Sequence, residues 1–200
     1  MDESTLQGAP KELFTPRLRL EHPRESHAAV VMESVNVSLG ELRFIAWGQV
    51  PFTAERAERF CRRNAERVAA GECLIYFVFD RETGAFVGNL DLHSFDFDVP
   101  RCQIGYVADS RQAGRGLMHE AGSALLQLAF ELGVARVEAW CDERNHRSIR
   151  LAERLGMKRE GLMRAYERDE SGELCNQVVL ARLRDDIAPF YNALPNPPSD

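Results

Sequence analysis

The sequence lacks the long apolar runs and the paired cysteines that would point to a membrane or an oxidising compartment. Its longest apolar run, residues 74–79, is far shorter than the ~20 residues of a membrane-spanning helix. The first five residues contain neither the basic nor the apolar part of a secretion signal. The five cysteines are odd in number and include no Cys-x-x-Cys, so we expect buried free thiols. These absences predict a cytoplasmic protein.

Positive charge is also in short supply. The chain has 25 Lys and Arg against 31 Asp and Glu, a net charge of −6, which disfavours general nucleic-acid binding. An apolar share of 44% and a charged share of 28% are typical of a globular protein. Because no linker or internal repeat interrupts the chain, we expect one domain over residues 11–188, with flexible segments at 1–10 and 189–200.

Alternating and helical spacings predict a mixed α/β fold. Short turns join three strands at residues 73–80, 86–93 and 102–108, which is typical of an antiparallel meander. A helix over 117–132 then leads to a strand at 135–141. Because a helix connects them, the strands at 102–108 and 135–141 should be parallel neighbours.

A glycine-rich turn separates the strand at 102–108 from the helix that follows it. Arg111-x-x-Gly114-x-Gly116 lets backbone N–H groups approach an anion, and the helix dipole directs its positive end to the same place. The turn therefore predicts a pyrophosphate cradle. The Gly-Lys-Ser/Thr of a P-loop is missing, and His119 stands where a dinucleotide-binding fingerprint requires its third glycine.

Five sequence motifs occur in a specific order. They are Thr15-Pro16-Arg17-Leu18-Arg19-Leu20, Cys102-Gln103-Ile104-Gly105-Tyr106-Val107, the glycine turn, Asn145-His146-Arg147-Ser148 and Leu155-Gly156-Met157-Lys158-Arg159-Glu160-Gly161. In this order they resemble the GNAT N-acetyltransferase superfamily, in particular its branch of RimJ/RimL-type ribosomal-protein alanine acetyltransferases, over about residues 11–185. The resemblance implies an α/β (α+β) GNAT fold with a mixed, mostly antiparallel sheet of seven strands and flanking helices. The parallel strands ending at Val107 and starting at Ala135 would splay apart, and acetyl-CoA would fill the gap.

The resemblance also implies which residues contact the cofactor. Backbone N–H groups of the turn would hold the pyrophosphate of acetyl-CoA, with the binding positions Arg111, Gln112, Gly114, Arg115 and Gly116. The backbone of Tyr106 and Val107 would pair with the pantetheine arm as an added strand does. Asn145 and Ser148, at the start of the next helix, would complete the cofactor site.

Acetyl transfer to an amine needs a neutral amine, a polarised carbonyl and a proton for the leaving thiolate. The N–H of Val107 is the predicted donor to the carbonyl, and the hydroxyl of Ser148 is the predicted donor to the thiolate. An α-amino group, with a pKa of about 7.7–8.0, needs only a modest base. A lysine side chain, near 10.4, would need stronger help.

The position of the base departs from the wider family. Much of that family has a glutamate in the strand before the glycine turn, where this chain has Gln103, and an amide cannot accept the proton. The RimL-type pattern places a glutamate seven residues after its Glu-Gly pair, which leads from Glu160 to Glu167. We therefore predict Glu167 as the base, acting through water; a solvated carboxylate in a charged turn is the alternative interpretation.

Two further residues are candidates for contacting the acceptor. Trp47 lies in the irregular segment 36–52, where the family builds its acceptor pocket, and Asp91 shares with His93 a strand face that could point toward the amine. A core tryptophan and a partly buried histidine are the alternative interpretations. His119-Glu120 lacks the second histidine of a zinc helix, because position 123 is serine, so no metal is predicted.

These features predict an acetyl-CoA-dependent N-acetyltransferase that transfers the acetyl group to a primary amine directly, within a ternary complex. The acceptor would be a small-molecule amine or a protein N-terminus. We expect no nucleic-acid or membrane partner, and either a monomer or a homodimer. Two alternatives stay open: a catalytically weak acyl-CoA-binding module, which Gln103 favours, and a nicotinamide-dependent enzyme.

Overall fold

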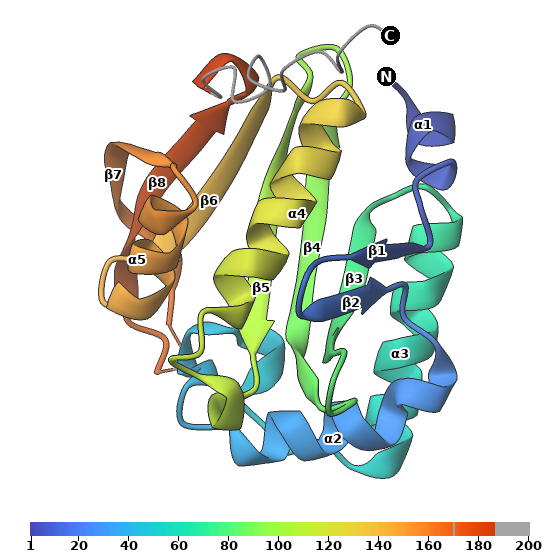
Figure 1. The fold of residues 1–200 in the computed structure, drawn as a ribbon. Helices are drawn as coiled ribbons and strands as arrows, with labels where there is room; N and C mark the ends of the chain where they lie inside the picture. The colour runs from blue at the N-terminus through green and yellow to red at the C-terminus, as the bar shows by residue number, and fades with distance from the viewer. Residues whose placement is uncertain (170, 187–200) are drawn as a thin grey trace, which may run out of the picture.

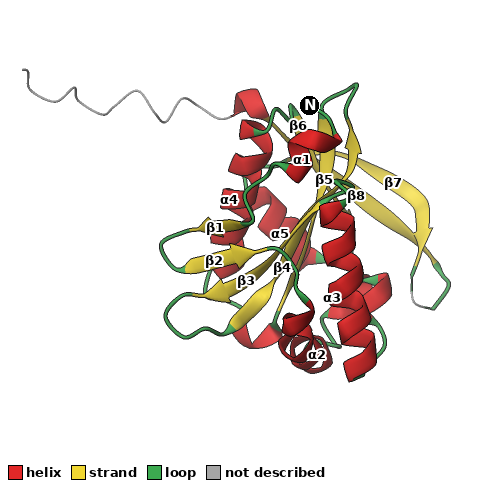
Figure 2. Cartoon of the chain, turned by 90° about the vertical axis from the view of Figure 1, so that its right-hand side faces the viewer, coloured by secondary structure: helices red, strands yellow, loops and turns green. Residues whose placement is uncertain are grey.

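A computed structural model describes residues 1–169 and 171–186, which form a sheet with helices on both faces (Figures 1 and 2). The strands are β1 (Glu12–Phe14), β2 (Leu18–Glu21), β3 (Leu74–Asp80), β4 (Phe86–Asp96), β5 (Arg101–Ala108), β6 (Arg136–Asp142), β7 (Lys158–Arg168) and β8 (Leu174–Leu183). The helices are α1 (Glu3–Gln7), α2 (Ala28–Val37), α3 (Ala54–Ala69), α4 (Leu117–Glu131) and α5 (His146–Arg154). Short 3₁₀ turns are η1 (Glu25–His27), η2 (Leu42–Phe44), η3 (Ala46–Gly48), η4 (Ser110–Gln112) and η5 (Arg184–Asp186). No helix within these two ranges combines the length and the apolar character needed to cross a bilayer.

The strands are arranged in the order β1-β2-β3-β4-β5-β6-β8-β7, and only the central β5–β6 pair is parallel. This arrangement confirms the predicted α/β class and the mixed, mostly antiparallel GNAT sheet. The sheet has eight strands rather than the predicted seven, because Glu12–Phe14 adds β1 beside β2. Three residues are too few for a strand-like alternation of polar and apolar residues to stand out in a sequence.

Helices cover both faces of the sheet (Figure 2), and a cluster of buried hydrophobic residues lies on each face. On one face, Leu90 of β4 is buried in the same cluster as Leu125 of α4. On the other face, Phe77 of β3 is buried with Val31 of α2 and Ala57 of α3. Because neighbouring residues of a strand point to opposite faces, β4 and β5 each present one set of side chains to α4 and another set to the side of α2 and α3.

The first ten residues, expected to be a flexible segment, make two specific contacts with their surroundings. Asp2 caps α1 by accepting a hydrogen bond from the N–H of Thr5 (3.0 Å), and the side chain of Leu6 is buried in the core with 1% exposure. A single apolar residue in a polar stretch is a weak sequence signal, and only the tertiary packing shows its partner. The other expected flexible segment, 189–200, lies outside the described residues.

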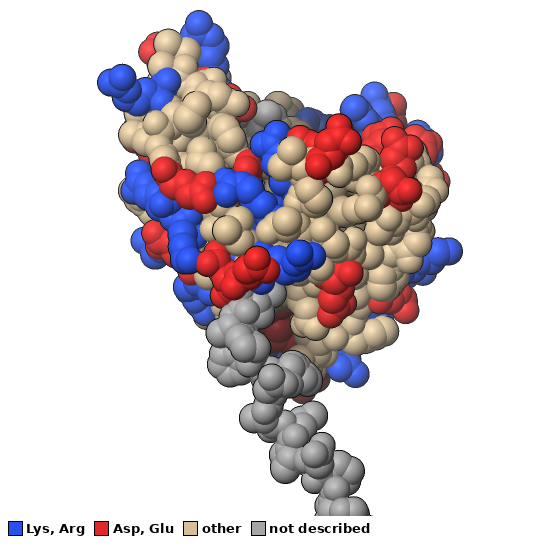
Figure 3. Space-filling view, turned by 90° about the horizontal axis from the view of Figure 1, so that it is seen from above, with Lys and Arg blue, Asp and Glu red and all other residues tan. Residues whose placement is uncertain are grey.

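Charged side chains of both signs are interspersed over the surface seen from above (Figure 3). Near the paired ends of β5 and β6, Arg136 bonds to Glu138 (2.7 Å) and to Glu160 (2.5 Å). The guanidinium of Arg101 lies 3.9 Å from the same Glu138. Since these ion pairs link β5, β6 and β7, they hold the strands together at the end where β5 and β6 still touch.

Candidate active site

The central feature of the site is the gap that opens between β5 and β6. The two strands are paired at Arg101↔Arg136, Cys102↔Val137 and Gln103↔Glu138. Beyond this point β5 continues beside β4 as far as Ala108, and β6 continues beside β8 as far as Asp142. The strands therefore diverge like a V, as the resemblance implied, and each leaves a backbone edge facing the gap (Figure 1).

Hydrogen bonds at its two ends show which backbone groups of β5 face the gap. At the start, the carbonyl of Pro100 accepts from the N–H of Ala135 (2.6 Å), on the β6 side. At the end, the N–H of Asp109 donates to the carbonyl of Val87 (2.9 Å), on the β4 side. Because successive residues of a strand direct their polar groups to alternate sides, the even-numbered residues of β5 face the gap and the odd-numbered ones face β4.

This alternation determines how the backbone groups of Val107 lie. The N–H of Val107 points toward its partner Asn89 on β4, not into the gap, so it is not placed to polarise a carbonyl held there. Tyr106 directs its N–H group into the gap instead, whereas the N–H of Ile104 lies at the last paired position, beside Glu138 of β6. The predicted pairing of Tyr106 with an added chain is compatible with this orientation, whereas Val107 faces the gap with neither its N–H nor its carbonyl.

Two hydroxyl groups and a thiol meet beside the gap. The phenol of Tyr106 donates to the carbonyl of Ser148 (2.8 Å), and the hydroxyl of Ser148 donates back to the phenol oxygen (3.1 Å). The Sγ atom of Cys141 lies 3.1 Å from the same Ser148 oxygen. Burial raises the pKa of the Tyr106 phenol and of the Cys141 thiol, so both groups keep their protons at neutral pH.

Helix α5 carries Ser148 to this position. The side chain of Asn145 caps the helix by accepting from the N–H of Ser148 (3.2 Å), which is the bond that an N-cap residue makes. The cap uses the amide oxygen of Asn145 and leaves its NH₂ group for another partner. Asn145 and Ser148 are thus brought close to Tyr106.

The glycine turn lies at the end of β5 and leads directly into α4. Gly114 and Gly116 have φ angles of +80° and +74°. Residues that carry a side chain adopt such angles only at a cost in free energy. Within the described chain, the N–H groups of Gly114, Arg115 and Gly116 make no hydrogen bond to protein. These N–H groups and the N-terminus of α4 form an electropositive concavity suited to phosphate oxygens.

The arginine side chains of the turn are bonded to carboxylates of the surrounding chain. Arg111 bonds to Asp109 (2.7 Å) and to Glu33, and Arg115 bonds to Asp80 (3.0 Å). Burial by itself would raise the pKa of Asp109, but the hydrogen bonds that Arg111 donates to its carboxylate lower that pKa. The turn therefore offers mainly its backbone to a ligand, which is the contribution that the resemblance assigned to it.

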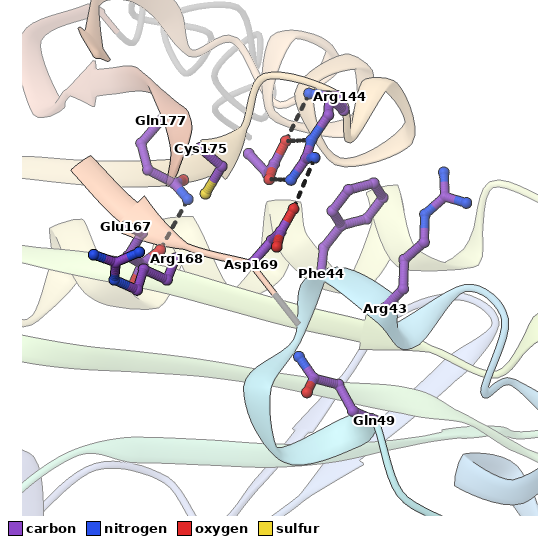
Figure 4. A pocket seen from close by; sticks show the side chains of 10 residues that line it. Arg43, Phe44, Gln49, Arg144, Glu167, Arg168, Asp169, Cys175 and Gln177 are labelled. Carbon is purple, nitrogen blue, oxygen red and sulfur yellow. Dashed lines mark hydrogen bonds and ion pairs between the residues drawn. The ribbon is translucent and has the colours of Figure 1, made fainter. Parts of the chain in front are cut away.

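A pocket of about 360 Å³ lies between the hairpin β7–β8 and the segment around η2 (Figure 4). Glu167 of β7 lines it, and its carboxylate accepts a hydrogen bond from the side chain of Gln177 (2.8 Å). Arg144 is bound on two sides, by Asp142 (2.6 Å) and by Asp169 (3.0 Å). The lining residues are Arg43, Phe44, Gln49, Asp142, Arg144, Glu167, Arg168, Asp169, Cys175 and Gln177.

The two predicted acceptor residues do not line this pocket. The ring of Trp47 packs against Phe60 (4.9 Å between centroids) and Phe52 (6.0 Å), which matches the alternative interpretation of a core tryptophan. From the same irregular segment, Phe44 and its neighbours line the pocket, and no sequence spacing distinguished them from Trp47. Asp91 lies elsewhere, on β4, where it bonds to His93.

A splayed parallel pair beside a glycine turn at a helix N-terminus, with part-buried hydroxyls at the gap, is the arrangement that the resemblance to acetyltransferases implied. Residues 17–158 match the sequence profile of the family described as "Acetyltransferase (GNAT) domain". The match covers more than half of the chain, and the chain belongs to the GNAT acetyltransferase family.

Individual relatives agree with this assignment. The chain is 29% identical over 119 residues to "Uncharacterized N-acetyltransferase p20" of Bacillus licheniformis, a match over 59% of this chain and 66% of that protein. The match thus spans just under two thirds of the length of that relative.

Two solved structures have the same fold. RimL, a ribosomal L7/L12 alpha-N-protein acetyltransferase in complex with coenzyme A, superposes with a TM-score of 0.79 at 23% identity, over 86% of this chain and 97% of its own. The microcin C7 self immunity acetyltransferase MccE, in complex with acetyl-CoA and AMP, also reaches 0.79, at 20% identity over 84% and 93%. At these identities the two structures show a shared fold.

Proposed function

We propose that the protein transfers the acetyl group of acetyl-CoA directly to a primary amine in a ternary complex. The observation that carries this proposal is the V-shaped gap, because the edge of β5 in the gap and the unpaired N–H groups of the glycine turn form one continuous backbone surface. That surface fits a ligand with an amide-containing arm and a pyrophosphate. The phosphates of acetyl-CoA would bind at Gly114–Gly116, its arm at Tyr106 and Asn145, and its thioester near Ser148.

The residues of the gap supply what the reaction needs. The amine nitrogen attacks the thioester carbon, while the N–H of Tyr106, the first gap-facing group beyond the last paired position, polarises the carbonyl oxygen. The carbon–sulfur bond then breaks, and the hydroxyl of Ser148 donates a proton to the leaving thiolate. The phenol of Tyr106 holds the Ser148 hydroxyl in place. Water returns a proton to Ser148 and takes up the proton that the amine loses as the new carbon–nitrogen bond forms.

The acceptor is proposed to be a protein N-terminal α-amine or a small-molecule amine. The RimL neighbour, which acts on the α-amine of a ribosomal protein, supports the first choice. The pocket beside Glu167 opens to solvent between a hairpin and a loop, which suits the free end of a chain. All five cysteines are unpaired, which supports a reducing compartment such as the cytoplasm.

A panel of amines tests the proposed function. Release of the CoA thiol is measured with peptides that begin with free α-amines, with polyamines and with other small amines. Acetylated product from at least one class is the expected result. Binding of acetyl-CoA without thiol release over the whole panel would instead favour an acyl-CoA-binding module, the second candidate that Gln103 supports.

Glu167 is proposed to attract the acceptor ammonium into the pocket, and its predicted role as base through water is tested at the same time. Glu167→Gln keeps an acceptor for Gln177 but removes the charge. We expect KM for the acceptor to rise about fivefold, the effect of losing a partly exposed ion pair of about 1 kcal/mol, with kcat nearly unchanged.

The pH profile separates the two roles of Glu167. If Glu167 is a base, its loss should lower kcat most at pH 6–7, where an α-amine is mostly charged, and least near pH 9. The matched control is Glu173→Gln, which removes an exposed carboxylate of the same hairpin outside the pocket lining. A loss of kcat confined to low pH in Glu167→Gln would assign the base role to Glu167.

A further inference from the structure

A pair of ionisable side chains lies on β4 at the closed end of the gap. Asp91 and His93 point to the same face of the sheet, the side of α2 and α3. His93 is the register partner of Gln103 on β5, and Gln103 is the last residue of β5 that still pairs with β6, at Glu138. The pair is therefore separated from the start of the gap by the width of one strand.

The geometry of the pair is specific. The Nδ1 atom of His93 lies 2.6 Å from the Oδ2 atom of Asp91. Gly105 stands opposite Asp91 on β5, and a Cβ atom there would lie 2.6 Å from the Oδ1 atom of Asp91. Any larger residue at position 105 would displace the carboxylate, so the absence of a side chain on β5 makes room for the pair.

The surroundings make His93 a base that water can reach. Its side chain is 34% exposed, and that of Asp91 is 26% exposed. The hydrogen bond that the Asp91 carboxylate accepts raises the pKa of His93 and outweighs the effect of burial. Gln103 on β5 also stabilises the protonated ring, while the charge of Arg67 on α3 opposes protonation. With Nδ1–H held by the carboxylate, Nε2 is the atom that accepts a proton.

We propose that His93, oriented by Asp91, takes the proton of the acceptor amine through a water molecule. The N–H proton passes through water to Nε2 as the new carbon–nitrogen bond forms, and the imidazolium later releases it to solvent. A base on β4 then serves where the wider family has a glutamate at the position of Gln103, and Gln103 stabilises the charged ring. The inference rests on the proposed function and leaves to Glu167 the binding of the ammonium.

The first test replaces the base. His93→Gln should lower kcat/KM about tenfold near pH 7.5, where an α-amine is still partly charged; this is less than the ~100-fold or more typical of a general base, because an α-amine needs little help. The deficit should shrink toward pH 9, where the α-amine is already neutral. His119→Gln, which alters a histidine bonded to the Arg154 carbonyl on the far side of the sheet, is the control and should keep the wild-type profile.

The second test shifts the pKa of the proposed base, His93, without removing its side chain. Because Asp91 raises the pKa of His93, Asp91→Asn should lower that pKa, so the acid limb of the pH profile moves to lower pH. Titration of the His93 ring by NMR should move in the same direction. A purely structural role for Asp91 would lower activity at every pH without moving the limb.

The outcomes separate this inference from the proposed function. If the wild type releases thiol but folded His93→Gln has the wild-type pH profile, His93 is not the base and the proposed function stands. An unmoved limb in Asp91→Asn would also overturn the inference, even if His93→Gln fails to fold. If the wild type acetylates no amine at any pH, the proposed function fails and the role of His93 fails with it.

Discussion

Replacing Ser148 with alanine should lower kcat about 100-fold, or about 2.7 kcal/mol, and leave the Kd of acetyl-CoA nearly unchanged. The hydroxyl would donate its proton only when charge develops on the sulfur, so its loss affects the transition state more than the bound ground state. The fold should tolerate the change, since Tyr106 keeps its bond to the Ser148 carbonyl and Asn145 keeps its cap on the N–H.

Tyr106→Phe provides the matched comparison for Ser148→Ala. It removes the phenol that bonds to the Ser148 hydroxyl but leaves that hydroxyl in place, so a smaller loss of kcat is expected. Steady-state kinetics and isothermal titration of acetyl-CoA on both variants separate turnover from binding. A Ser148→Ala enzyme with near-normal kcat would reduce this serine to a residue of the helix start.

Gly116→Val should weaken CoA binding at least tenfold, or about 1.4 kcal/mol, in a protein that still folds. The new side chain would stand among the N–H groups that are proposed to hold the pyrophosphate. It would also strain a backbone held at φ +74°, where a β-branched residue is disfavoured. Direct titration of CoA measures the effect on affinity.

Gly133→Val controls for backbone strain in this experiment. Gly133 lies beyond the other end of α4 with φ +102°, and a Cβ atom added there would meet open space, so valine causes comparable strain away from the glycine turn. We expect a similar loss of thermal stability in both variants but weaker CoA binding only in Gly116→Val. Equal CoA affinity in the two folded variants would show that the pyrophosphate does not bind at this turn.

Much of the fold could be predicted from local sequence patterns. The glycines, the alternation of residues 102–108 and the helical spacing after Leu117 are short-range signals, because each depends on the conformation of a few neighbouring residues. The same signals predicted the glycine turn and the cap residue Asn145. What they missed, the strand β1 and the packing of Leu6, are short elements that exist only through contacts with distant parts of the chain.

The side chains that build the acceptor side could not be predicted in the same way. Trp47 was a candidate because its segment lies where the family builds its acceptor pocket, yet Phe44 lines the pocket and Trp47 packs against the core. The pocket contains residues of η2, β6, β7 and β8, which are far apart in the sequence. Which member of an irregular segment faces them depends on how the loop packs, and no periodicity encodes that choice.

The sequence by itself determined the family, the order of most elements and the glycine turn, since all of these are encoded in residues that are close along the chain. Only the tertiary structure decided which backbone groups face the gap and which side chains meet. A shift of one residue in the pairing of β5 would place the backbone groups of Val107, rather than those of Tyr106, at the edge that faces the gap. The space above Gly105 on β5 leaves room for Asp91 to bond to His93 on β4. Both depend on strand pairing, a long-range property that is settled only when the whole sheet has formed.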